Sequence, residues 1–90
     1  MNVLLIAYDP SVEASAKASL DQIAKNQPGW ARVLTNVFVT VTPLSASELR
    51  DTLIKASNSK LLVYNVTNLP WGTNKVDSEV TEWLKNNWQQ

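Results

Sequence analysis

The pattern of hydrophobic and polar residues divides the chain into strand-like and helix-like segments. Residues 3–8 are apolar at odd and even positions alike, so both faces of a strand here would be apolar. This is typical of a strand buried in the middle of a sheet. Residues 31–42 are rich in β-branched side chains, but this segment is long for one strand, so we expect a short hairpin or a bend near Thr35–Asn36. Residues 60–67 alternate again and predict a last strand, with Tyr64 in the core.

Three other segments place their apolar residues at the spacing of an amphipathic helix. The first follows Asp9–Pro10, where the aspartate is expected to cap the helix and the proline to take its first position. Asp21 is expected to point away from the apolar side of this helix. The second helix should begin after Ser45, which is spaced to form a capping box with Glu48, and the third after Asp77.

The order strand, helix, strand, strand, helix, strand, helix predicts an α+β fold. We interpret it as a ferredoxin-like plait (βαββαβ), an antiparallel sheet with helices packed on one face, with an added C-terminal helix. The last helix is a candidate to cover the face of the sheet that the plait leaves exposed. Ninety residues leave no room for a second core, so a single ferredoxin-like domain spans residues 1–90.

Composition excludes many kinds of chemistry. The chain has no cysteine and no histidine, which removes disulfides, thiolate nucleophiles, Cys/His zinc sites and Ser-His-Asp triads. With only two glycines it has no glycine-rich phosphate loop, so we expect no nucleotide cofactor. The net charge is zero, and the apolar run near the N-terminus is too short for a signal peptide or a membrane span. We therefore expect a cytoplasmic protein without a membrane partner.

Several short motifs resemble those of one family. The opening strand that ends in Tyr8–Asp9 and the segment 32–38 look like parts of the small CRISPR-associated adaptation protein, a dimeric scaffold. The closest likeness is to the SinR-like group of small bacterial proteins related to that fold, through Trp30, the helix 44–51 and the tail 83–87. The resemblance implies a ferredoxin-like homodimer. Some members of the CRISPR-associated family are proposed to be metal-dependent nucleases.

Asp9 is the one candidate for catalysis or metal binding. Two copies of this aspartate across a dimer axis could hold one Mg²⁺ or Mn²⁺ against a phosphodiester. The alternative is that Asp9 only caps a helix, and the absence of arginines in residues 10–14 favours that role. Arg32 is a candidate contact for nucleic acid, but a solvated surface role is favoured, because the few separated cations supply little counterion release.

The tryptophans are the candidates for an interface. Trp71 lies in a predicted loop and Trp88 near the C-terminus, and for both we weigh an interface role equally with a core role. Trp83 shares the apolar stripe of the last helix and is expected in the core.

These observations favour a non-enzymatic homodimer that acts as a macromolecule-binding, scaffold or regulatory module. A protein partner is favoured over nucleic acid, and no cofactor is expected. The first alternative is a metal-dependent endonuclease that uses Asp9 with Mg²⁺ or Mn²⁺ across a dimer interface. A second alternative is an inhibitor or immunity-type protein of a bacterial or phage conflict system.

Overall fold

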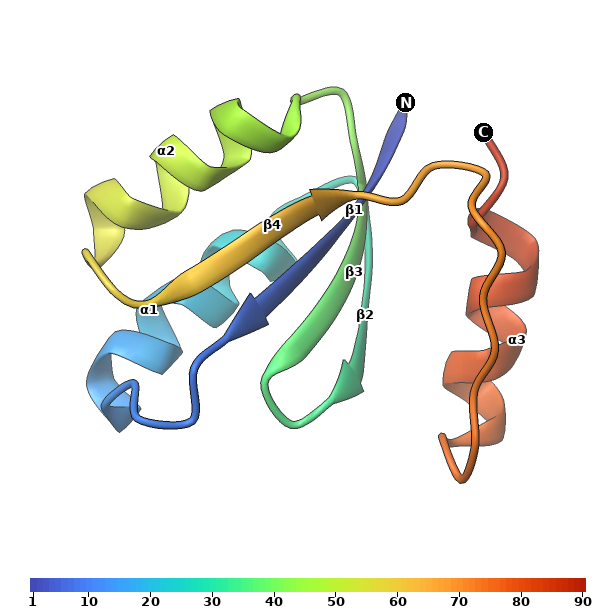
Figure 1. The fold of residues 1–90 in the computed structure, drawn as a ribbon, viewed down its shortest axis with the longest axis horizontal. Coiled ribbons are helices and arrows are strands. Elements are labelled where there is room, and N and C mark those ends of the chain that lie inside the picture. Colours follow the sequence, from blue (N-terminus) through green and yellow to red (C-terminus); the bar gives the residue numbers. More distant parts are fainter.

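The structure is a computed structural model that describes residues 1–90. It contains four strands and three helices in the predicted order (Figure 1). Their bounds are β1 (Asn2–Tyr8), α1 (Ala14–Lys25), β2 (Gly29–Leu34), β3 (Val37–Thr42), α2 (Ala46–Ala56), β4 (Leu61–Asn65) and α3 (Ser78–Asn87).

The strands form one antiparallel sheet in the order β2-β3-β1-β4. Residues Thr35–Asn36 make the tight turn of the β2–β3 hairpin, in which Leu34 pairs with Val37, so the segment 31–42 is a hairpin rather than a bent strand. Strand β1 lies between β3 and β4, and it is apolar on both faces because Leu4, Ile6 and Tyr8 pack under α1 and α2 whereas Val3 packs under α3. The predicted fold class, α+β of the ferredoxin-like type, is confirmed.

Helices α1 and α2 pack on one face of the sheet, which we call the helix face (Figure 1). Alternate residues of β1 point to this face and meet Phe38 of β3. The buried residues of this core are Leu4, Ile6, Tyr8, Leu20, Ala24, Phe38, Leu49 and Leu53. The two helices close this core, as the stripes of apolar residues along them predict.

Helix α3 lies on the other side of the sheet, which we call the second face (Figure 1). Its Leu84, together with Trp88, packs against Val3, Val39 and Val41. Gly29 permits this close approach, because a Cβ atom there would lie 3.2 Å from Val41 Cβ and 3.3 Å from Trp83 Cζ2. The added C-terminal helix therefore covers part of the face that the plait helices leave open.

The ends of the helices follow local chemistry. At α2 the capping box is present, since Ser45 Oγ accepts from Glu48 N at 3.2 Å and Glu48 Oε1 accepts from Ser45 N at 2.9 Å. The expected cap at Asp9 was wrong, because α1 begins only at Ala14. Asp9 Oδ1 instead accepts from the amide and hydroxyl of Ser11, and this turn separates β1 from the helix.

Two further expectations about burial were wrong. Tyr64 is 53% exposed, because its side chain points to the second face at β4, away from the part that α3 covers. Asp21 is buried rather than pointing into solvent, because its side of α1 faces Arg32 on β2. Asp77 stands at the N-cap position of α3 as predicted, without a hydrogen bond from its side chain.

Candidate interaction surface

The second face has an open part beyond α3, and the strand registers define it. One row of neighbours crosses the whole sheet from Leu34 through Val37 and Ala7 to Leu62. In the next row, Leu5 stands opposite Tyr64. We call these six residues the open patch: Leu5, Ala7, Leu34, Val37, Leu62 and Tyr64.

The open patch is apolar and uncharged. Leu34, Leu62 and Tyr64 are 57%, 55% and 53% exposed, and none of the six residues carries a charge. A solvated face of an antiparallel sheet normally carries polar residues in these positions. A contiguous exposed apolar patch of this kind is characteristic of an interaction site.

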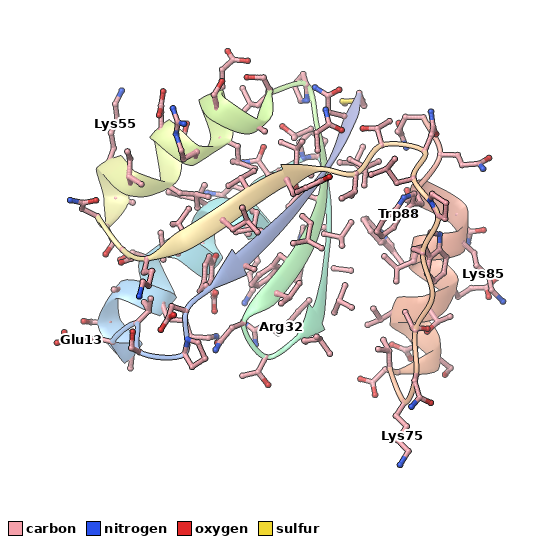
Figure 2. All side chains as sticks on the ribbon, in the orientation of Figure 1. Glu13, Arg32, Lys55, Lys75, Lys85 and Trp88 are labelled. Atoms are coloured by element: carbon pink, nitrogen blue, oxygen red, sulfur yellow. The ribbon has the colours of Figure 1, made fainter.

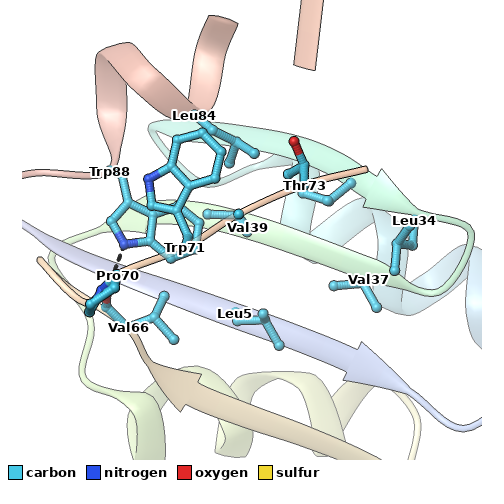
Figure 3. Close-up of a pocket in the computed structure, with 12 residues that line it drawn as sticks. Leu5, Leu34, Val37, Val39, Val66, Pro70, Trp71, Thr73, Leu84 and Trp88 are labelled. Atoms are coloured by element: carbon cyan, nitrogen blue, oxygen red, sulfur yellow. Dashed lines mark hydrogen bonds between the residues drawn. The ribbon is translucent and has the colours of Figure 1, made fainter. Parts of the chain in front are cut away.

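An apolar groove of about 320 Å³ adjoins the open patch (Figure 3). Its floor is formed by sheet residues such as Leu5 and Val39, and its walls are formed by the loop Pro70–Thr73 and by Leu84 of α3. No charged residue lines it, and Thr73 supplies the one aliphatic hydroxyl. An occupant of this groove would therefore be apolar and uncharged where it contacts the protein.

The two candidate interface tryptophans form one wall of the groove together (Figure 3). The ring of Trp71 stacks on that of Trp88, with 5.5 Å between centroids and 25° between planes. Trp88 is 7% exposed, and its Nε1–H donates to the carbonyl of Val66 at 3.0 Å. Trp71 is half-buried. Trp88 is therefore the buried ring on which Trp71 stacks, and Trp71 is the more accessible of the two at the groove.

The loop that carries Trp71 is fastened to the C-terminus of the chain. Asn68 has a positive φ of 60°, and its side-chain oxygen accepts from Gln90 N at 3.1 Å. Its side-chain amide donates to Gln90 O at 3.4 Å. Thr67 Oγ1 accepts from the amide of Val3 at 2.8 Å, which ties the start of the loop to β1. These hydrogen bonds fix the start of the loop that leads to the groove wall.

Asp9 lies at the end of β1, in a shallow pocket that Lys60 also lines. Hydrogen bonds from the hydroxyl and the amide of Ser11 hold the pKa of its carboxyl below the ordinary value, and Lys60 adds to this effect. The chain has no group of three or more Asp, Glu, His or Cys residues placed to hold a metal ion. Asp9 therefore contributes a single carboxylate at this position.

Arg32 forms an ion pair within the chain while 41% of its side chain stays exposed (Figure 2 labels its position). Its Nη2 lies 2.7 Å from Asp21 Oδ2, which Lys17 Nζ also approaches at 3.1 Å. The guanidinium also lies over the ring of Phe38, 5.1 Å from the centroid. The sequence did not reveal this cluster, because Asp21 occupies a position that reads as the polar side of its helix.

Tyr8 lies beside this partly exposed cluster. Its hydroxyl and Asp21 Oδ1 are both buried without a hydrogen-bond partner. Burial raises the pKa of the Tyr8 hydroxyl above its ordinary value of 10.0, the nearby Asp21 carboxylate raises it further, and Arg32 opposes the rise. The hydroxyl therefore stays neutral near pH 7 and is poorly suited to act as a base.

Sequence reasoning missed the open patch, although a signal was present. Residues 61–64 are apolar at odd and even positions alike, although the helices cover only one face of this edge strand. The side chains on its other face are therefore apolar and exposed. The place of β4 at the edge could not be read from its own residues. The missed residues are Leu34, Leu62 and Tyr64.

Comparisons with known proteins add no family to this picture. The chain matches no protein-family model, and neither a curated protein nor a solved structure is significantly similar to it. None of the three helices has the length and apolar character needed to cross a membrane.

Proposed function

We propose that this protein is a non-enzymatic homodimer that binds a partner protein through the open patch and the adjoining apolar groove. The observation that carries the proposal is the row of uncharged apolar residues from Leu34 to Leu62, whose two end residues are more than half exposed. The occupant we propose is an uncharged apolar segment of a partner protein. The resemblance to the SinR-like group and to the CRISPR-associated scaffold agrees with this role and remains a prediction.

Charge supports a protein partner over nucleic acid. Nucleic-acid affinity depends on cations that neutralise phosphates, and neither the open patch nor the groove carries one. Arg32, the candidate phosphate contact, is paired with Asp21 on the other face of the sheet. An uncharged apolar surface instead gains its binding energy from the burial of apolar area.

A peptide array with matched variants tests this proposal. The probes are uncharged peptides rich in Val, Leu and Phe, and the same peptides with Lys and Asp inserted. We expect the uncharged set to bind the wild type and to lose at least tenfold in affinity for Leu34→Lys and Trp71→Ala. Ile54→Lys is the matched control, because Ile54 is an exposed apolar residue on α2, on the helix side of the sheet.

Two outcomes would contradict the proposal. The first is that no uncharged peptide binds the wild type, or that Leu34→Lys binds as the wild type does. The second is binding of labelled RNA or DNA that Arg32→Ala abolishes and Leu34→Lys leaves intact.

A further inference from the structure

Strand β4 lies at one edge of the sheet with its outer main-chain groups unpaired. It pairs with β1 alone. Lys60 O accepts from Asp9 N at 3.0 Å and Val66 N donates to Val3 O at 2.9 Å, so the even-numbered residues direct their main-chain groups toward β1. Hydrogen-bonding direction alternates along an antiparallel pair. Leu61, Val63 and Asn65 therefore present their N–H and C=O groups outward.

The opposite edge of the sheet is protected, whereas β4 is not. Strand β2 has a register irregularity between Arg32 and Leu34, and it carries the charge of Arg32. A helix packs against each edge strand, α3 against β2 and α2 against β4, so the difference between the edges lies in the strands themselves. Strand β4 contains no charge, no proline and no bulge. Natural edge strands usually carry such features when they are to remain unpaired.

We infer that β4 pairs with β4 of a second copy of this chain, in antiparallel orientation about a two-fold axis at Val63. This inference rests on the homodimer of the proposed function and specifies its interface. The register that overlaps the whole strand sets Val63 opposite the partner's Val63 and Leu61 opposite the partner's Asn65. Each of these pairs exchanges two hydrogen bonds through the outward groups. The two sheets become one continuous sheet.

The side chains of β4 fit a second copy. In this register Leu62 stands opposite the partner's Tyr64 on the second face, twice by symmetry. An aromatic residue opposite an aliphatic one is a favourable cross-strand pair, and these two side chains are each more than half exposed. No charge faces another charge along the strand. The same pairing also joins the two open patches into one surface for a partner protein.

The small size of the interface sets the expected affinity. A five-residue edge buries less than the roughly 800 Å² per partner of a standard interface. We therefore expect a dissociation constant of about 1–100 μM, so that dimer and monomer are both measurable. An interface of this composition should also form without any metal or other ligand.

Cysteine cross-linking tests the register. Because the chain has no native cysteine, only the introduced cysteines can form disulfides. Leu62→Cys and Tyr64→Cys proteins are mixed and oxidised mildly with diamide. Because residues 62 and 64 face each other as a non-hydrogen-bonded pair, about 4.5 Å apart at Cα, the mixture should form a disulfide-linked dimer at least fivefold faster than either variant alone. Leu34→Cys, equally exposed on the same face but at the other edge, is the control and should not cross-link faster in any mixture.

Proline substitution tests the main-chain bonds. Val63→Pro removes an N–H that has no partner within the chain, so the variant should fold but weaken dimerisation at least tenfold. Tyr64→Pro is the matched control, because it removes an N–H directed toward β1 and should unfold the protein. Circular dichroism and sedimentation report the two properties separately.

The outcomes distinguish the inference from the proposed function. Dimerisation that persists in folded Val63→Pro, or cysteine variants that cross-link equally in all mixtures, would overturn the β4 pairing and leave a homodimer. A wild type that stays monomeric at about 500 μM would overturn both the pairing and the homodimer. Peptide binding to the open patch is measured independently of either result.

Discussion

The Trp71 ring stacks on Trp88 with 5.5 Å between their centroids, and Trp88 in turn donates a hydrogen bond to the carbonyl of Val66. One tryptophan is thus part of the core between α3 and the sheet, and the other lies on its outer side as a wall of the groove. The position of Trp71 at the groove therefore depends on Trp88, which packs in the core beneath α3.

The two tryptophans should contribute unequally to stability. Trp88→Ala removes a buried ring and its hydrogen bond to the Val66 carbonyl, which keeps only the bond from Leu69 N, so we expect it to lower the free energy of unfolding by about 3–5 kcal/mol. Trp71→Ala should lower it by about 1–2 kcal/mol, since this ring is only half-buried. Urea unfolding measures both. Equal losses would show that Trp71 belongs to the core rather than to the surface of the groove.

Tyr8→Phe should not destabilise the protein. The Tyr8 hydroxyl is buried without a hydrogen-bond partner, so its removal relieves a desolvated polar group. We expect the free energy of unfolding to stay unchanged or to rise by about 1 kcal/mol in urea titrations. A loss of more than about 1 kcal/mol would mean that the hydroxyl is satisfied by a bound water.

Acid should weaken the capping of α2. Hydrogen bonds with Ser45 hold the pKa of Glu48 below its ordinary value of 4.5. A carboxylate whose pKa is lower in the folded state stabilises the protein above the unfolded-state value, and that contribution is lost as pH falls through the folded-state value. Asp9 acts in the same direction through Ser11. Stability should therefore fall as pH decreases below about 4.5.

Glu48→Gln isolates this contribution. Glutamine keeps an oxygen that can accept from Ser45 N but does not titrate. Urea midpoints measured at neutral and acidic pH should therefore change less in the variant than in the wild type. An identical change in both proteins would show that Glu48 has no part in the acid response.

Asp9→Ala tests the nuclease alternative directly. Wild type and variant are incubated with labelled single- and double-stranded RNA and DNA in Mg²⁺, Mn²⁺ or EDTA. Because the amide and the hydroxyl of Ser11 both donate to Asp9 Oδ1, we expect no metal-dependent difference between the two proteins. Metal-dependent cleavage that disappears in a folded Asp9→Ala protein would instead support the endonuclease.

Dimerisation should depend little on salt. The β4 strand carries no charge, and its contacts are main-chain hydrogen bonds and apolar side chains. Exposed charge pairs weaken as salt shortens the Debye length from about 10 Å at 0.1 M to about 3 Å at 1 M. We expect the dissociation constant to change less than about threefold across this range, as measured by sedimentation. A tenfold weakening would indicate an ionic interface elsewhere on the molecule.

Much of the fold could be predicted from the sequence, because helix-capping residues and the spacing of apolar residues determine it. Strand β1 is apolar on both faces since a hydrophobic core lies on each side of it, and the capping box at Ser45 sets the start of α2. The start of α1 was missed because Asp9–Pro10 has the composition of a helix cap, while the Asp9 side chain is used in a turn with Ser11.

The surface was harder to predict, because it depends on how elements that are distant in sequence meet. The alternation in β4 identifies two rows of side chains but not the row that a helix covers, so Tyr64 was placed in the core. Asp21 reads as solvent-facing until β2 brings Arg32 against it. The tryptophan pair was recognised residue by residue, whereas its stacking depends on the loop that returns Trp71 to Trp88.

Sedimentation equilibrium of the wild type tests the central claim, a homodimer that presents an uncharged apolar surface, most directly. Samples from about 5 to 500 μM bracket the expected dissociation constant. The mass should rise with concentration from 10.0 kDa toward twice that value. A folded protein that remains at 10.0 kDa throughout would contradict the claim.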